Sequence, residues 1–145
     1  LGDVYKRQAR NMETTVFMLS NALAGGQYDR SLQLLDQLFY QNEEPISILA
    51  VLSSAFVDMY RVQVALESGG TYHTPAQWFD YKGKEFRLRN AQRDMRGLSS
   101  GQLRQILSLL METDIQMKST RVSKRVLLEK LITRILLVAK GRYDT

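Results

Sequence analysis

Apolar residues recur every three or four positions along almost all of this 145-residue chain, and glycine pairs interrupt the pattern at Gly25-Gly26 and Gly69-Gly70. This spacing gathers apolar side chains on one face of a helix, whereas a half-buried strand alternates apolar and polar residues. No segment shows sustained alternation, so we expect no strands. The pattern predicts an all-α fold, a single compact bundle of about six to seven helices.

Start and stop signals set the expected helix bounds. Pro45 suits a first helical position, because its fixed φ is helical and its missing N–H would have no partner there. Ser99 or Ser100 and Ser123 are suitable N-caps. Met111 and Val126 are expected to face inward with the other apolar residues of the last two helices. We expect helices at 14–24, 29–40 and 45–67, a short one after Thr74-Pro75, and others at 84–95, 99–117 and 123–140.

The length and composition fit one globular domain. The chain is 44% hydrophobic and 24% charged, too apolar for a disordered protein. Residues 1–12 show no helical stripe and are expected to be a leader or a disordered remnant. The helical domain is expected at 13–140, with a tail at 141–145.

Charge is divided unevenly along the chain. Residues 1–81 hold five Lys and Arg against nine Asp and Glu, whereas residues 82–145 hold fifteen against six. The balances are −4 and +9, which indicate either an anionic partner for the second half or subunits that meet acidic face to basic face. A solvated basic surface without a partner is the third interpretation.

The chain offers little for catalysis or for binding a cofactor. It has no Cys, which is compatible with a reducing cytoplasm, and His73 is its single histidine, expected in a solvated loop. No nucleophile is paired with His73, no cluster of metal ligands is evident, and no Gly-x4-Gly-Lys-Ser/Thr loop is present for a nucleotide. We therefore expect no catalytic, cofactor or metal site. The apolar runs are also too short to span a membrane.

Three polar residues stand out in the second half. Asp114 and Lys118 are four residues apart, so they share one helix face. Glu129 lies among Leu127, Leu128, Leu131 and Ile132, where an unpaired carboxylate would be costly to bury. We expect an ion pair from Lys118 to Glu129 that fixes how the last two helices dock. A direct contact with a partner is the alternative.

Aromatic and cationic residues are interleaved between Trp78 and Arg93. This combination can stack bases and neutralise phosphates, so Lys84, Arg87, Arg89 and Arg93 are candidates for nonspecific DNA contact. The same aromatics could instead fill the gap between a short helix and its neighbours. Core packing is the interpretation that we favour.

Several weak features occur in a recognisable order. Glu43-Glu44-Pro45 is followed by the apolar run from Ile46 to Leu52, then by Phe56 and Tyr60-Arg61; Asp114-x-x-x-Lys118 and Leu127-Leu128-Glu129-x-Leu131-Ile132 come later. From about Thr14 to Lys140 the chain resembles the C-terminal domain of the bacterial DNA polymerase III delta subunit. That family usually has a proline beside the Phe that opens a basic helix, and Glu85 replaces it here.

The resemblance implies a role in DNA replication. In clamp loaders, such helical domains associate side by side into a collar, and the loader opens a sliding clamp and places it on primed DNA. The implied partners are the other clamp-loader subunits, with weak or indirect contact to primed DNA and no membrane. Contact with the sliding clamp is implied for an N-terminal module that this sequence does not include. The implied location is the bacterial cytoplasm, at the nucleoid.

Two other functions remain open at this point. The basic second half would suit an independent helical nucleic-acid-binding domain. The leucine-rich helices between Asp29 and Leu66 would suit a helical-hairpin adaptor of the tetratricopeptide kind, although the 34-residue period of that family is missing.

Overall fold

The computed structural model describes residues 2–141, with side chains from residue 11 onward. Over this range the chain forms six α-helices and two short 3₁₀ turns, without strands, so the all-α prediction is confirmed. The α-helices are α1 (Gly2–Ala24), α2 (Tyr28–Tyr40), α3 (Pro45–Glu67), α4 (Phe86–Asp94), α5 (Ser100–Ser119) and α6 (Lys124–Ala139), and the 3₁₀ turns are η1 (Thr74–Gln77) and η2 (Met95–Gly97).

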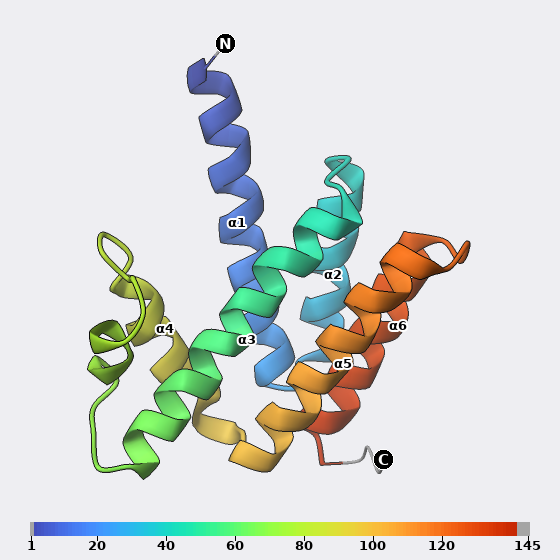
Figure 1. The fold of residues 1–145 in the computed structure, drawn as a ribbon. Helices are drawn as coiled ribbons and strands as arrows, with labels where there is room; N and C mark the ends of the chain where they lie inside the picture. The colour runs from blue at the N-terminus through green and yellow to red at the C-terminus, as the bar shows by residue number, and fades with distance from the viewer. Residues whose placement is uncertain (1, 142–145) are drawn as a thin grey trace.

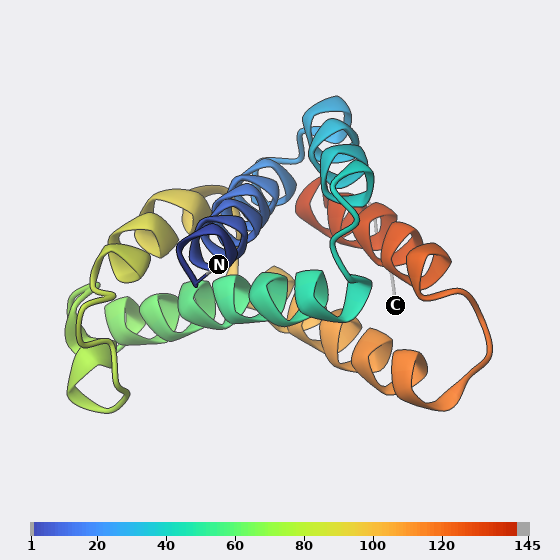
Figure 2. The same ribbon diagram turned by 90° about the horizontal axis from the view of Figure 1, so that it is seen from above.

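Helix α3 is the centre of the bundle. It packs against α1, α4, α5 and α6, and η1 rests on its C-terminal end. Figures 1 and 2 show α3 and α5 along one side of the molecule, with α1, α2 and α6 behind them and α4 beside α1. Its inward side chains, among them Ile48, Leu52 and Phe56, are completely buried. This helix therefore contacts most of the other elements directly, while α2 packs against α1.

The composition of α3 explains this central place. In the described part of the chain it is the one helix long and apolar enough to cross a membrane, and half of that apolar stretch is buried in the bundle. An apolar helix packed on several sides is typical of the core of an all-α domain.

Helix α1 begins earlier than the sequence predicts. It starts at Gly2 and not at about residue 14, so residues 2–12, expected to be a leader or a disordered remnant, lie in a helix that the sequence does not predict. Lys, Arg, Gln, Ala and Met, which dominate this segment, are good helix formers even without an apolar stripe. Figure 1 shows these first turns extending beyond the other helices. Of the expected tail, only Gly141 lies within the described residues.

The predicted helix ends are confirmed at several positions. Gly26 and Gly69 have φ values of 67° and 85°, in the left-handed region that glycine adopts without strain. The hydroxyl of Ser99 accepts a hydrogen bond from the backbone N–H of Gln102, and the side-chain oxygen of Gln102 accepts one from the backbone N–H of Ser99, which together form a capping box. The side-chain NH₂ of Gln102 donates to the carbonyl of Val138, so Gln102 joins the start of α5 to the end of α6.

Other details differ from the prediction. The segment after Thr74-Pro75 forms only a 3₁₀ turn, and α4 begins at Phe86, directly after Glu85. Met111 and Val126 are 63% and 53% exposed and do not face the core. Core positions on those helices are taken by neighbours such as Leu109 and Leu128.

Candidate functional site

One buried carboxylate organises the face where α3, α4 and the preceding segment meet. Asp58 on α3 is 2% exposed and accepts hydrogen bonds on both oxygens. Its Oδ1 accepts from the hydroxyl of Tyr81 at 2.6 Å, and its Oδ2 accepts from Nε and Nη2 of Arg87 at 2.9 and 2.8 Å. A buried ion is tolerated when it is paired and fully hydrogen-bonded, and this one is.

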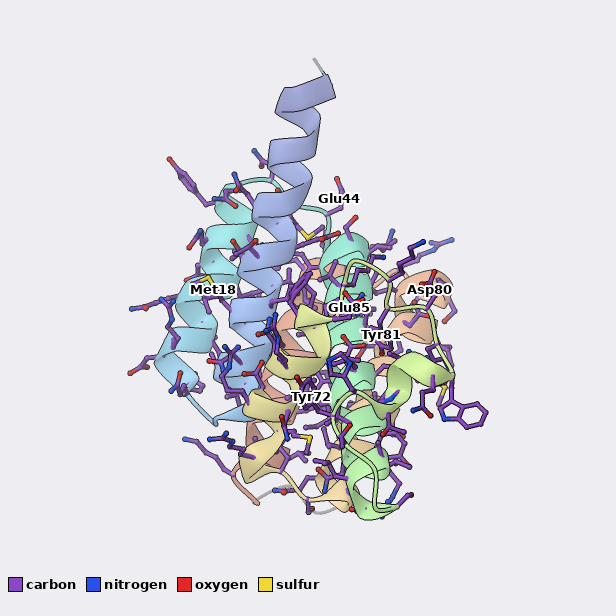
Figure 3. The ribbon with its side chains drawn as sticks, turned by 90° about the vertical axis from the view of Figure 1, so that its left-hand side faces the viewer. Met18, Glu44, Tyr72, Asp80, Tyr81 and Glu85 are labelled. Carbon is purple, nitrogen blue, oxygen red and sulfur yellow. The ribbon has the colours of Figure 1, made fainter. Side chains whose placement is uncertain are left out.

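Tyr81 extends the network toward the end of α3. Its oxygen accepts a bond of 3.0 Å from Arg61, whose guanidinium carbon lies 3.5 Å from the centre of the Phe79 ring. Figure 3 looks onto this face, with Tyr81 between its own loop and α3. Burial raises the pKa of Tyr81, and the hydrogen bond to the Asp58 carboxylate raises it further. Tyr81 therefore keeps its proton and donates to Asp58.

The four candidate DNA contacts differ in their ion pairs and in their exposure to solvent. Arg87 pairs with Asp58 and its side chain is 19% exposed, so it serves the packing of α4 on α3, and its contact with DNA stays a prediction. Arg93 is exposed and pairs with Asp94 at 2.9 Å. Lys84 and Arg89 are exposed. Helix α4 thus uses Arg87 for packing and presents Arg89 and Arg93 to solvent, and Lys84 is exposed in the segment before it.

A cleft of about 620 Å³ lies between α1, α3 and α4. Asp94 forms part of its wall and accepts bonds from Asn21 on α1 at 2.6 Å and from Arg93 at 2.9 Å. Met18 and Phe86 line it and are 42% and 46% exposed. No buried polar side-chain atom in the described residues is without a hydrogen-bond partner.

The predicted ion pair between α5 and α6 is not formed. Lys118 pairs with Asp114 at 3.0 Å on its own helix, and Glu129 pairs with Arg125 at 3.2 Å on its own helix. Glu129 is exposed, so it does not need the buried partner that its apolar neighbours suggested. The two helices are linked by a different pair, Arg134 with Glu112 at 3.3 Å.

Sequence reasoning missed Asp58. The single available signal was an acidic residue within an otherwise uncharged stretch of α3, three residues before Arg61. Its partners Tyr81 and Arg87 lie 23 and 29 residues away, and no local spacing connects them.

His73 is exposed in its loop, as predicted, with its ring 4.7 Å from that of Tyr72. In the part of the chain with described side chains, no three His, Asp or Glu side chains converge as metal ligands would.

The outer side of α3 is free of charge in its first half. We define the outer α3 face as Ile46, Ala50, Ser53, Ser54 and Val57, which are exposed or half-buried. Ile46 is 46% exposed, and no charged residue occurs in α3 before the buried Asp58. An exposed surface without charge is typical of the centre of a protein interface.

Comparison with known proteins assigns the chain. The family profile described as "DNA polymerase III delta subunit, C-terminal domain" matches residues 13–135. The chain is 32% identical over 136 residues to the DNA polymerase III subunit delta of Bacillus subtilis (strain 168), covering 94% of this chain and 39% of that protein. It also resembles the solved structure of the Bacillus subtilis DNA clamp loader delta protein, with a TM-score of 0.77 and 31% identity over 86% of this chain and 36% of that one.

The chain therefore spans less than half the length of the relatives that it matches. The match nevertheless includes nearly all of the helical domain, from the second half of α1 to the last turns of α6. Sequence and fold agree, and the chain belongs to the family of C-terminal domains of the DNA polymerase III delta subunit.

Proposed function

We propose that this domain is an assembly element of a bacterial clamp loader. It joins the delta subunit to other loader subunits in a collar of helical domains, and the assembled loader opens a sliding clamp and places it on primed DNA. The domain itself catalyses no reaction and acts in the cytoplasm. The family assignment supports this proposal, together with the name of the solved relative as a clamp loader delta protein.

The outer α3 face is the observation that carries the assembly role. It presents small and apolar side chains, and the charged residues farther along α3 do not interrupt it, because Asp58 is buried and Arg61 lies over Phe79. Such a surface gains free energy by leaving water, and it has few charges to desolvate. A neighbouring helical domain would satisfy it.

Contact with DNA is secondary in this proposal. Of the four candidate DNA contacts, Arg87 is held by Asp58 and Arg93 by Asp94, which leaves Lys84 and Arg89 to attract phosphates. Two exposed cations supply only weak, nonspecific binding. In this proposal, contact with the sliding clamp is made by the part of the delta subunit outside the matched region.

Mixing experiments test the assembly role. We would co-express the chain with the other clamp-loader subunits of the same organism and measure complex formation by size exclusion with light scattering. Ala50→Arg places a charge on the outer α3 face and is expected to weaken assembly by at least about tenfold. The matched control, Gln33→Arg, places the same charge on an exposed position of α2 and is expected to leave assembly intact.

Two outcomes would contradict the proposal. If the wild-type chain forms no complex with any loader subunit, the assembly role is wrong. If Ala50→Arg assembles as well as the wild type while Gln33→Arg does not, the domain assembles through another face.

A further inference from the structure

A second pocket, separate from the outer α3 face, lies between the last turns of α3 and the segment that follows. Its volume is about 410 Å³, and Tyr60, Val64, Pro75, Trp78 and Phe79 form most of its wall. Trp78 is 77% exposed and Val64 41%. We call it the Trp78 pocket. Large exposed apolar side chains around a hollow are typical of binding sites.

The Trp78 pocket contains one charge without a counter-charge. Arg61 is the single ionised side chain in its lining. It donates to the hydroxyl of Tyr81 and lies over the Phe79 ring, and within the described residues no carboxylate pairs with it. The nearest acid of the network, Asp58, is already paired with Arg87. Four of the five N–H groups of Arg61 thus remain available in an apolar setting.

We propose that the Trp78 pocket binds a short peptide segment of a partner protein that carries a carboxylate beside an apolar side chain. The apolar side chain would lie between Trp78 and Val64, and the carboxylate would pair with Arg61. Arginine bonds to carboxylates are charge-assisted and directional, and aromatic residues and arginine dominate binding energy at protein interfaces. This inference does not depend on the collar role.

A nucleic acid is less well suited to this pocket. Binding to DNA or RNA relies on several cations that neutralise phosphates. From residue 60 to residue 85 the charges cancel, since Arg61, Lys82 and Lys84 are matched by Glu67, Asp80 and Glu85. An exposed tryptophan could stack on a base, but the cancelling charges around it would not attract the phosphate backbone of a nucleic acid.

A peptide selection followed by a titration tests the proposal. The folded 145-residue chain would be immobilised and used to select from a displayed library of random octapeptides. We expect enriched peptides to carry Asp or Glu within about two residues of an aromatic or aliphatic side chain. Because Trp78 is the only tryptophan of the chain, its fluorescence reports occupancy directly, and a bound peptide should shift its emission to shorter wavelength.

Two variants locate the binding. Val64→Asp places a negative charge in the pocket wall and should weaken the selected peptide by at least about tenfold. Val126→Asp makes the same change at an exposed valine on α6, and affinity should stay within about twofold. Arg61→Gln should remove the preference for the acidic peptide over its Asn or Gln analogue. Circular dichroism melting checks that each variant is folded. If Arg61→Gln does not fold, the comparison of Val64→Asp with Val126→Asp tests the proposal by itself.

The proposal is overturned if no peptide is enriched, if enriched peptides lack acidic residues, or if Val126→Asp weakens binding as much as Val64→Asp. It is also overturned if a deoxythymidine decamer shifts the emission of Trp78 while the selected peptides do not. That last result would assign the pocket to single-stranded nucleic acid.

Discussion

The hydroxyl of Tyr81 donates a hydrogen bond of 2.6 Å to the carboxylate of Asp58, 23 residues earlier in the chain. The bond joins a segment that has only one turn of 3₁₀ helix to the central helix α3. The second oxygen of the same carboxylate holds Arg87 at the start of α4. One side chain therefore fixes both the loop and the helix that follows it.

Removal of this carboxylate should destabilise the domain strongly. Asp58→Ala leaves the partly buried Arg87 without its counter-ion and Tyr81 without its acceptor, and we expect a loss of about 3–5 kcal/mol in the free energy of unfolding. Urea denaturation followed by circular dichroism measures it. Asp36→Ala, at an exposed position of α2, should cost less than about 0.5 kcal/mol.

A double-mutant cycle isolates the pair itself. The combined change of Asp58→Ala with Arg87→Met should cost clearly less than the sum of the two single changes, with a coupling above about 1 kcal/mol. Additive losses would show that Arg87 and Asp58 do not support one another.

The charges at the far end of α5 and α6 should behave differently. Glu129 is exposed and pairs only with Arg125 on its own helix, so Glu129→Ala should cost no more than about 0.5 kcal/mol. A cycle between Glu129→Ala and Lys118→Met should show coupling near zero, because the two side chains have separate partners. A coupling above about 1 kcal/mol would restore the inter-helix pair expected from the sequence.

Stability should fall at high pH through Tyr81. An unfolded tyrosine has a pKa of about 10, and the folded value is raised by burial and by Asp58. The unfolded chain therefore loses this proton first as the pH rises. The stabilisation is complete below about pH 10 and is lost as the pH rises through the folded pKa.

Melting temperatures between pH 8 and 11 should show this loss in the wild type and less of it in Tyr81→Phe. Tyr28→Phe, at a half-exposed position, is the control and should follow the wild type. Equal slopes for wild type and Tyr81→Phe would show that Tyr81 does not titrate in this range.

Binding to primed DNA should be weak and sensitive to salt. For the isolated chain we expect a Kd of about 10 µM or higher at physiological salt. The affinity should fall steeply as the salt concentration rises. Lys84→Ala with Arg89→Ala should reduce both the affinity and the salt slope, without loss of stability. Fluorescence anisotropy with labelled primed DNA measures both. Submicromolar, sequence-selective binding would favour an independent nucleic-acid-binding domain.

Local sequence signals were sufficient for the fold class and for several helix ends. The periodicity predicted an all-α bundle, Pro45 and Ser99 marked helix starts, and Gly26 and Gly69 marked helix ends, because these features act within a few residues. The start of α1 was not predictable from the same signals. Residues 2–12 have helix-forming side chains but no apolar stripe, so a method that reads amphipathic spacing does not detect them.

Long-range pairing accounts for what the sequence could not reveal. The sequence makes Arg87 a candidate DNA contact, because its neighbours in the chain are basic and aromatic. Only the fold places it beside Asp58, 29 residues away. Glu129 was expected to need a partner because its neighbours are leucines, but its own side chain points to solvent on the opposite face of α6.

Gln102 has a consequence for how the molecule opens. Its side chain accepts a hydrogen bond from the backbone N–H of Ser99, the N-cap of α5, and donates one to the carbonyl of Val138 in the last turn of α6. One side chain therefore links the two helix ends. Fraying of either end must break bonds that belong to the other. Backbone amides at the two ends should therefore exchange with solvent deuterium as one cooperative unit, and the last turn of α6 should be protected far beyond what is usual so close to the end of a helix.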